Sequence, residues 1–198
     1  MSAPELVLAS TSRYRRALLD RLGVPYRAVA PLIDERALEP RGVSVEEVVL
    51  TLARAKADEV AGREPRALVL GSDQAIELEG EILGKPGTPE RAVEQLARLS
   101  GRTHRIVTAV ALWRPGGEVH THVDVHRMKM RALGRAALEA YVALENPVDC
   151  AGAYKIESRG LALFEAVEGR DYTAVIGLPL LAVVTMLEAA GVRVVSRG

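Results

Sequence analysis

The chain has 198 residues, of which 48% are hydrophobic and 26% are charged, which is enough to form one domain around a hydrophobic core. Lysine plus arginine and aspartate plus glutamate both total 26 residues, so the net charge is zero. This balance excludes a global positive field that would point to nucleic acid or a membrane surface as a partner. Any recognition of an anion must therefore be local.

The single cysteine, Cys150, has no second cysteine with which to form an internal disulfide. The first residues, MSAPELVLAS, lack the basic segment and the apolar core of a signal peptide. The longest apolar stretch, at 175–187, is too short to span a bilayer. We therefore expect a cytoplasmic protein in which Cys150 is a small buried thiol.

The first third of the chain alternates between a strand pattern and helix patterns. The apolar run ELVLAS at 5–10 predicts a buried strand, and apolar residues at helical spacing predict a helix over 13–22. Ser44 and Glu47 form the sequence pattern of a capping box, which predicts a helix over 44–61. The first strand is thus followed directly by a turn into a helix.

Strands dominate the middle of the chain. RALVLGSDQAIELEGEILG at 66–84 predicts a buried strand, a break at 71–73 and a hairpin that turns at Glu79 and Gly80. Thr88 and Pro89 then begin a helix, which Gly101 ends.

The last part of the chain adds a long hairpin and two helices. Runs at 104–113 and 118–130 flank the turn sequence RPGG. A helix over 135–144, a strand at 161–167 and a final helix opened by Gly-Leu-Pro at 177–179 follow. The alternation predicts an α/β fold with a mixed β-sheet flanked by helices. The length and composition allow a single domain over 1–198 with two lobes around a cleft.

The segment STSRYRR at 10–16 gathers hydroxyl groups and arginines at a predicted helix start. Free backbone N–H groups there, together with Arg13, Arg15 and Arg16, could hold phosphate oxygens. The segment lacks the glycines and the Gly-Lys-Ser/Thr ending of a Walker A loop. Taken alone, it fits an anion site and a capped helix with a solvated arginine face equally well.

Glu35 and Asp73 lie in predicted loops beside apolar runs. Mg²⁺ takes one or two carboxylates together with substrate phosphates and water, so these two acids could share a metal site if they meet. Each acid alone would more simply serve solubility. The chain contains 22 arginines and four lysines, so Lys56, Lys85 and Lys155 become candidates for phosphate contacts.

The segment HTHVDVH at 120–126 places three histidines and an aspartate on one face of a strand. These side chains could ligate zinc, but the same alternation is typical of a half-solvated strand. No further cluster of ligands supports a metal there, so we expect this face to contact solvent.

Seven blocks in the same order along nearly the whole chain resemble the Maf family, the septum-formation-inhibitor-like nucleotide pyrophosphatases. The blocks are LASTSRYRRALLDRLG at 8–23, DE at 34–35, LARAKA at 52–57, GSDQAIELEGEILGKP at 71–86, LSGRTHRIVTAVAL at 99–112, GAYKIE at 152–157 and EGRDYTAVIGLPL at 168–180. The resemblance implies an elongated α/β fold related to the inosine triphosphate pyrophosphatases. It also implies hydrolysis of a nucleoside triphosphate to a monophosphate and pyrophosphate with a divalent metal, Mg²⁺ or Mn²⁺, in a homodimer.

The resemblance assigns roles to individual residues of this chain. It implies that Asp73 accepts a proton, that Glu35 and Asp73 hold the metal, and that Lys56 and Lys85 contact phosphates. The phosphate-binding loop is then Ser10, Ser12 and Arg15. With Lys56, Lys85, Glu35 and Asp73 in place, the negative partner of the arginine-rich helix start is the triphosphate.

Finer motifs resemble the branch of the family that prefers 7-methyl-GTP and clears modified nucleotides. The branch carries an aromatic, a Gln and a Lys where this chain has Tyr14, Gln74 and Lys155. Tyr14 could stack on the cationic methylated base or only pack on the site wall. Glu157 could accept hydrogen bonds from guanine.

The family usually has Pro at the position of Arg13 and often Asn at that of Thr173. The second departure puts a turn contact in doubt. Two alternatives to the 7-methyl-GTP enzyme remain open: a dTTP/UTP pyrophosphatase of the same family, and a non-catalytic nucleotide-binding regulator of cell division.

Overall fold

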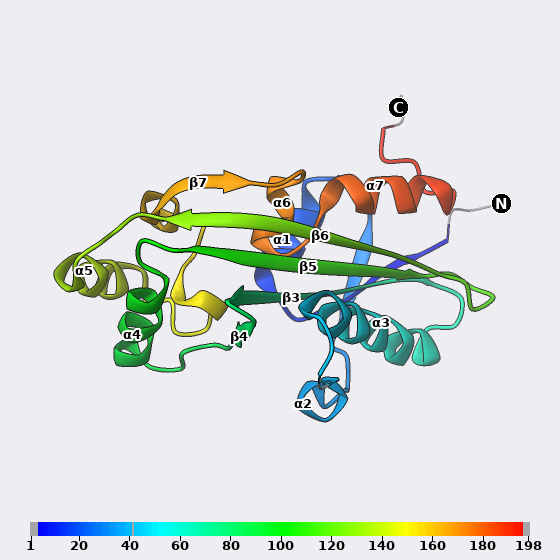
Figure 1. Cartoon of the computed structure of the whole chain (residues 1–198). Coiled ribbons are helices and arrows are strands. Elements are labelled where there is room, and N and C mark those ends of the chain that lie inside the picture. Colours follow the sequence, from blue (N-terminus) through cyan, green and yellow to red (C-terminus); the bar gives the residue numbers. More distant parts are fainter. Residues whose placement is uncertain (1–3, 41, 196–198) are drawn as a thin grey trace. The chain divides into compact units, whose positions relative to one another are not determined.

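The computed structural model describes residues 4–40 and 42–195 and contains the expected alternation of helices and strands (Figure 1). The elements in chain order are β1 (Leu6–Ala9), α1 (Arg13–Asp20), β2 (Tyr26–Val29), α2 (Glu35–Leu38), α3 (Val45–Arg63), β3 (Leu68–Leu78), β4 (Glu81–Leu83), α4 (Pro89–Leu99), β5 (Thr103–Trp113), β6 (Val119–Met130), α5 (Arg135–Glu145), the 3₁₀ turns η1 (Ala151–Ala153) and η2 (Arg159–Leu163), β7 (Phe164–Glu168), α6 (Tyr172–Ile176) and α7 (Leu180–Ala189). Within the described ranges, no helix combines the length and the apolar character needed to cross a membrane.

The strands form a mixed sheet in the order β2-β1-β3-β5-β6-β7, with β4 paired to β3. β1 runs parallel to both β2 and β3, and Leu6 of β1 lies opposite Tyr26 and Leu68. β3 and β4 are antiparallel, as are β6 and β7. The predicted α/β class with a mixed sheet is therefore confirmed.

The chain divides into two compact units. The first unit comprises Met1–Gln74, Thr108–Asp124 and Asp171–Gly198, and the second comprises Ala75–Val107 and Val125–Arg170. A division into two parts agrees with the two lobes expected from the sequence. The assignment of 1–198 to one domain stays a prediction.

One face of the sheet in the first unit packs against α1 and α7. Alternate residues of a strand point to the same face, so the leucines of β1 and β3 that share a parity lie together. The main buried members of this cluster are Leu6, Leu8, Leu18, Leu19, Leu68, Leu70, Val110, Leu112, Leu180, Val183 and Leu187. This core fixes the end of β1, and therefore the turn that leads into α1.

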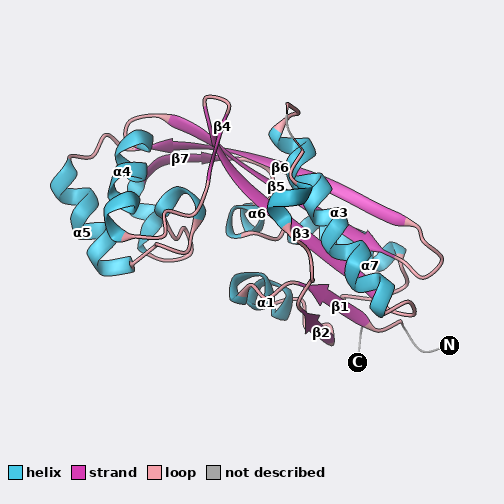
Figure 2. Ribbon diagram, turned by 90° about the horizontal axis from the view of Figure 1, so that it is seen from below, coloured by secondary structure: helices cyan, strands magenta, loops and turns pink. Residues whose placement is uncertain are grey.

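The opposite face of β3 lies against α3, which Figure 2 shows lying over the sheet. A Cβ atom on Gly71 would come within 2.2 Å of the Ala53 carbonyl oxygen and within 3.1 Å of the Ala57 Cβ. Gly71 therefore lets the helix backbone approach the strand directly. Side chains two residues further along β3 must point toward the same helix.

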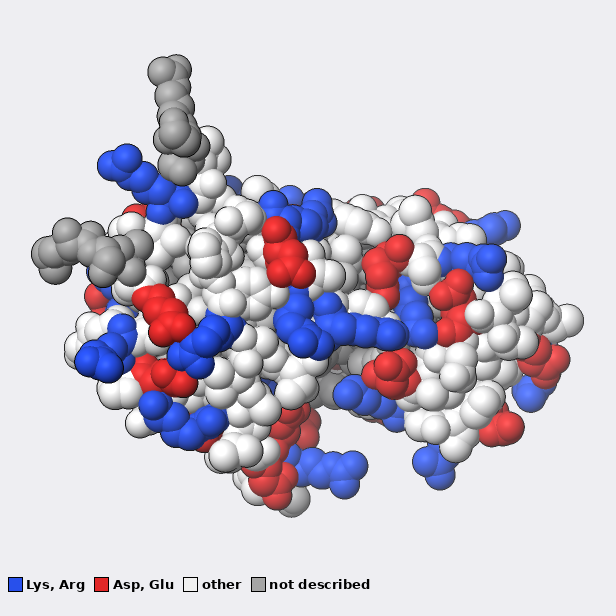
Figure 3. All heavy atoms as spheres, turned by 180° about the vertical axis from the view of Figure 1, so that it is seen from behind, with Lys and Arg blue, Asp and Glu red and all other residues white. Residues whose placement is uncertain are grey.

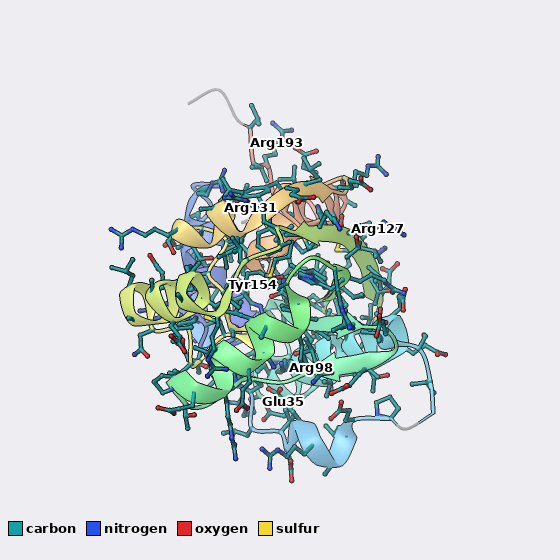
Figure 4. The ribbon with its side chains drawn as sticks, turned by 60° about the vertical axis from the view of Figure 1, so that its left-hand side comes forward. Glu35, Arg98, Arg127, Arg131, Tyr154 and Arg193 are labelled. Atoms are coloured by element: carbon teal, nitrogen blue, oxygen red, sulfur yellow. The ribbon has the colours of Figure 1, made fainter. Side chains whose placement is uncertain are left out.

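In the second unit, α4 packs against both α5 and η1. His104 of β5 shares a hydrogen bond of 2.9 Å between its Nε2 and the Tyr154 hydroxyl, and Phe164 packs edge-on against the Tyr154 ring. Figure 4 labels Tyr154 inside this unit. Burial lowers the pKa of His104 to about 4, so the imidazole is neutral at neutral pH.

Two sequence predictions about strands are wrong. The expected break at 71–73 is absent, because β3 continues unbroken from Leu68 to Leu78. The strand expected over 161–167 begins at Phe164, since the preceding residues form the 3₁₀ turn η2. The hairpin turns at Glu79 and Gly80 and at the RPGG sequence are confirmed.

The expectation that the polar face of the HTHVDVH segment contacts solvent is also wrong for its second half. Asp124 and His126 are buried, with exposed fractions of 5% and 2%. The reason is that Met128 and Met130, which continue the same face of β6, are fully buried. The burial of a strand face is decided by its apolar residues, and here they lie just beyond the motif.

The prediction that Cys150 is a buried thiol is wrong, because this side chain is half-buried.

The close approach of α3 to β3 predicts the effect of adding one methyl group. Replacing Gly71 by Ala should destabilise the fold by about 2 kcal/mol, because the new Cβ would overlap the Ala53 carbonyl. A Cβ added at Gly62, which lies on α3 itself, would meet no atom within 4 Å, so Gly62→Ala is the control. Urea unfolding of both variants checks this; equal stability for Gly71→Ala and wild type would contradict it.

Candidate active site

A buried lysine lies at the centre of the candidate site. The Lys56 Nζ is 2.6 Å from Asp73 Oδ1 and 3.0 Å from Glu35 Oε1. Lys56 and Asp73 are 5% and 8% exposed, whereas just over half of the Glu35 side chain is exposed. The structure therefore brings together three residues that are 21 and 17 positions apart in sequence order, and all three belong to the first unit.

Local structure explains how each member reaches this point. Asp73 lies two residues after Gly71 on β3 and so points toward α3. Lys56 lies on the buried face of α3, which it shares with Ala53 three residues before it and Ala57 directly after it. Glu35 is the first residue of α2 and is labelled at that helix in Figure 4. The N-cap residue of this helix, Asp34, accepts hydrogen bonds from the Arg36 and Ala37 amides.

The charges in this cluster act on one another. Burial raises the pKa of Asp73 above its ordinary value, and the Glu35 carboxylate raises it further, whereas Lys56 and Arg15 oppose the shift. Burial lowers the pKa of Arg15, against the attraction of Asp73 and Glu35. Two cations and two acids thus share one region, with Arg15 close enough to Asp73 and Glu35 to feel their charge.

The turn between β1 and α1 carries Ser10, Ser12 and Arg15. Ser12 is the N-cap of α1 and its hydroxyl accepts a hydrogen bond from the Arg15 amide at 3.4 Å. The Ser12 amide in turn donates to the Ser10 hydroxyl at 3.1 Å. The capped helix, one of the two interpretations that the sequence left open, is therefore present, and the first turn of α1 contains no acidic residue. An anion near this helix start would meet positive potential from the helix and from arginine.

The Arg15 side chain is held from the other end of the chain. Its Nε donates to the Gly177 carbonyl oxygen at 3.0 Å. The buried Ser72 hydroxyl donates to the same oxygen, also at 3.0 Å. Sequence reasoning missed both Ser72 and Gly177 as site residues. The one local signal was strand alternation, which places Ser72 on the face of β3 opposite to Asp73.

Tyr14 carries a cation on its ring in this structure. The Arg13 guanidinium lies 4.8 Å from the ring centroid, and its Nη2 donates to the Tyr14 hydroxyl at 2.7 Å. This geometry is that of a cation–π contact. The departure at Arg13 from the usual proline therefore gives Tyr14 a neighbour that a proline could not supply.

Gln74 and Lys155 make hydrogen bonds to the backbone. The Gln74 amide nitrogen donates to the Ala174 carbonyl at 2.8 Å and to the Thr108 hydroxyl at 2.9 Å. The Lys155 Nζ donates to the Glu145 carbonyl at 2.6 Å, at the end of α5. Gln74 thus joins β3 to α6, and Lys155 satisfies a carbonyl at a helix C-terminus. Both side chains have structural contacts besides the base-reading roles that the resemblance implied.

Lys85 and Glu157 belong to the second unit. Both are exposed, and Lys85 lines a pocket of about 250 Å³ together with Arg91, Arg98 and Gln95. The cluster around Lys56 lies in the first unit and forms without them. Their assignment to the site stays a prediction.

The turn contact placed in doubt by Thr173 is present. The Thr173 hydroxyl donates to Asp171 Oδ1 at 2.6 Å and accepts from the Leu180 amide at 2.8 Å. Asp171 Oδ2 also accepts from the Leu181 amide at 2.7 Å. Thr173 and Asp171 therefore satisfy amides at the start of α7 and fix the turn that contains Gly177.

Across the described ranges, no group of three or more His, Cys, Asp or Glu side chains is arranged to hold a metal ion. Glu35 and Asp73, which meet at Lys56, are two oxygen-bearing side chains of the kind Mg²⁺ takes when substrate phosphates and water complete its coordination. The donor set thus fits a metal that arrives with phosphate.

The face in Figure 3 mixes acidic and basic side chains, in agreement with the zero net charge.

Comparisons with known proteins agree with these features. Residues 5–190 match the family model described as Maf-like protein. The chain is 43% identical to a 7-methyl-GTP pyrophosphatase of Bdellovibrio bacteriovorus over 190 residues, which are 96% of this chain and 99% of that protein. It is also 43% identical to a 7-methyl-GTP pyrophosphatase of Pseudomonas aeruginosa over 192 residues, with the same coverage of both chains.

Among solved structures, the Staphylococcus aureus Ham1 protein is similar with a TM-score of 0.47 and 20% sequence identity. The similarity covers 65% of this chain and 72% of that chain.

The buried cluster predicts how Asp73 titrates. Its pKa should lie above the ordinary 3.8 because burial penalises the carboxylate, and Lys56→Met should raise it further because the attraction of the ammonium is lost. Lys129→Met removes a lysine of the second unit that binds the Gly101 carbonyl, and should leave the Asp73 pKa unchanged. Carboxyl carbon NMR titrations check this, and a lower Asp73 pKa in Lys56→Met would contradict it.

Proposed function

Because the chain belongs to the Maf-like protein family, we propose that it hydrolyses nucleoside triphosphates to monophosphates and pyrophosphate, with 7-methyl-GTP as its substrate. The cluster of Lys56, Asp73 and Glu35, in the same unit as the arginine-bearing start of α1, supports this proposal most strongly. Its role would be to clear a modified nucleotide.

The chemistry needs a water molecule activated beside a phosphate. Asp73 is the group to orient this water and accept its proton, since burial raises its pKa toward the range useful for a base. Attack on phosphorus forms a bond from the water oxygen, and the bond to the pyrophosphate oxygen breaks. Lys56 lies 2.6 Å from Asp73 and can balance charge that develops on the phosphoryl oxygens.

The triphosphate is the negative partner that the start of α1 lacks. Arg15, held by its Nε, can direct its terminal nitrogens at phosphate oxygens, and Ser10 and Ser12 supply hydroxyl groups at the helix start. In this proposal Lys85 contributes a further phosphate contact. A bound divalent cation, Mg²⁺ or Mn²⁺, held by Glu35 and Asp73 would neutralise phosphate charge.

The preference for 7-methyl-GTP is supported by the names of the relatives and by the chemistry of Tyr14. A methylated guanine is a flat cation, and the Tyr14 ring already holds the flat Arg13 guanidinium at 4.8 Å. A base bound there would replace one cation by another. We extend the proposal to Gln74, Lys155 and Glu157 as the groups that recognise the base.

Two alternatives follow from the same residues. A dTTP/UTP pyrophosphatase would use the same cluster with a different base site, and the relatives' names favour 7-methyl-GTP over it. A non-catalytic regulator of cell division would only bind nucleotide, and binding alone does not require a buried potential base. Burying Asp73 and Lys56 costs several kcal/mol in desolvation, a cost that favours a catalytic role.

The proposal also includes a cytoplasmic location, where nucleoside triphosphates are found, and assembly as a homodimer. Sedimentation of the purified chain at working concentration tests the dimer.

Asp73→Asn tests the proposed catalytic role. The substitution keeps the size of the side chain but removes the proton acceptor, so pyrophosphate release from 7-methyl-GTP should fall by roughly 10²–10⁴-fold. Asp58→Asn, at an exposed position on the same helix as Lys56, is the matched control and should keep the wild-type rate. The measurement is the initial rate with saturating Mg²⁺. An Asp73→Asn enzyme with the wild-type rate would remove Asp73 from the mechanism.

A further inference from the structure

Ser72 is buried beside the candidate site and has no role in the chemistry proposed above. It is 0% exposed and lies next to Asp73 on β3, so its side chain points to the opposite face of the strand. There its hydroxyl donates to the Gly177 carbonyl oxygen at 3.0 Å. A hydrogen bond at this depth fixes the carbonyl to the central strand of the unit.

The Gly177 carbonyl oxygen accepts a second hydrogen bond, from Arg15 Nε at 3.0 Å. A carbonyl oxygen has two lone pairs, so one atom can serve both donors. Three distant parts of the chain thus meet at it: the start of α1, the middle of β3 and the turn after α6. The contact links a catalytic strand to a phosphate-binding side chain.

Gly177 is the C-cap residue of α6, where the backbone leaves the helix. Its φ is +130°, a region that residues with a Cβ rarely adopt, and glycine has the greatest backbone freedom of any residue. Its amide nitrogen is bound within α6, to the Thr173 and Ala174 carbonyls. The peptide group that contains this carbonyl is also held by the Leu178 amide, which donates to the Thr173 carbonyl at 3.3 Å. The carbonyl oxygen itself is bound by the side chains of Ser72 and Arg15, and Ser72 is the fully buried donor of the two.

The point of attachment on Arg15 has a consequence for binding. The guanidinium has five N–H groups, and the bond to Gly177 uses the one on Nε. The four N–H groups on the two terminal nitrogens form the fork that matches phosphate geometry. Holding Nε therefore sets the plane and direction of the fork while leaving its outer edge available for an anion.

We propose that Ser72 is a positioning residue: through the Gly177 carbonyl it orients the Arg15 guanidinium toward the triphosphate. The inference rests on the proposed function for its kinetic consequence, whereas the hydrogen-bond relay itself can be tested without substrate. Ser72 touches neither substrate nor metal in this arrangement. It acts through Gly177 on Arg15.

The first experiment measures the relay directly. Hydrogen exchange of the Arg15 Nε–H is followed by NMR in the free protein, and the signal is assigned by its loss in Arg15→Lys, which has no Nε–H. Ser72→Ala should accelerate this exchange by about tenfold or more, because the anchored carbonyl becomes mobile. Ser100→Ala, which also removes a hydroxyl that donates to a backbone carbonyl but in the second unit, should leave it unchanged. Exchange that is unchanged or slower in Ser72→Ala would overturn the proposal.

The second experiment is a double-mutant cycle on kcat/KM for 7-methyl-GTP. Ser72→Ala should lower kcat/KM by about five- to tenfold in the wild-type background, the usual worth of one hydrogen bond. In the Arg15→Ala background it should cause no further loss, because the side chain that it orients is gone. Equal losses in both backgrounds would show a general structural effect and overturn the positioning role. Melting temperatures confirm that each variant is folded.

These two readouts separate the inference from the proposed function. If no triphosphate is cleaved by the wild-type protein, the proposed function fails while the exchange result still decides the relay. If 7-methyl-GTP is cleaved and the cycle is additive, the positioning role fails and the proposed function stands.

Discussion

The ion cluster of Lys56, Asp73 and Glu35 ties three elements of the candidate site together. An ammonium at 5% exposure loses most of its hydration, and such a loss costs several kcal/mol unless opposite charges replace the water. Asp73 at 2.6 Å and Glu35 at 3.0 Å supply those charges. Lys56 can therefore remain buried only while α3, β3 and the start of α2 hold their positions. The local fold and the proposed chemistry both require these three elements to keep the charged groups together.

β3 organises both sides of this arrangement. Gly71 and Asp73 face α3, where the missing side chain of the first permits the close contact that brings Lys56 to the second. Ser72 and Gln74 face the other way and bind backbone carbonyls of Gly177 and Ala174. Strand alternation thus assigns Gly71 and Asp73 to the contact with α3, and Ser72 and Gln74 to the contacts with the α6 region. An interruption of β3 at 71–73 would have lost both.

Much of the fold could be predicted from local patterns, and much of the site could not. Capping by Ser12 and Ser44 and the two hairpin turns depend on residues a few positions apart, which the sequence displays directly. The contact between Ser72 and Gly177 joins residues 105 positions apart, and no periodicity reveals such a pairing. Lys56, Asp73 and Glu35 were grouped by a family resemblance; residue patterns alone left each acid as a plausible surface charge. The buried polar face of β6 was missed because Met128 and Met130, outside the motif, decide its burial.

Substrate preference decides whether this cluster serves the hydrolysis of a methylated nucleotide. Pyrophosphate release is compared at equal concentrations of 7-methyl-GTP, GTP, dTTP, UTP and CTP with Mg²⁺, and the nucleotide product is identified. We expect the highest initial rate with 7-methyl-GTP, and 7-methyl-GMP as its product. Faster release from dTTP or UTP would contradict the substrate assignment, and no release from any of the five would contradict the enzymatic function itself.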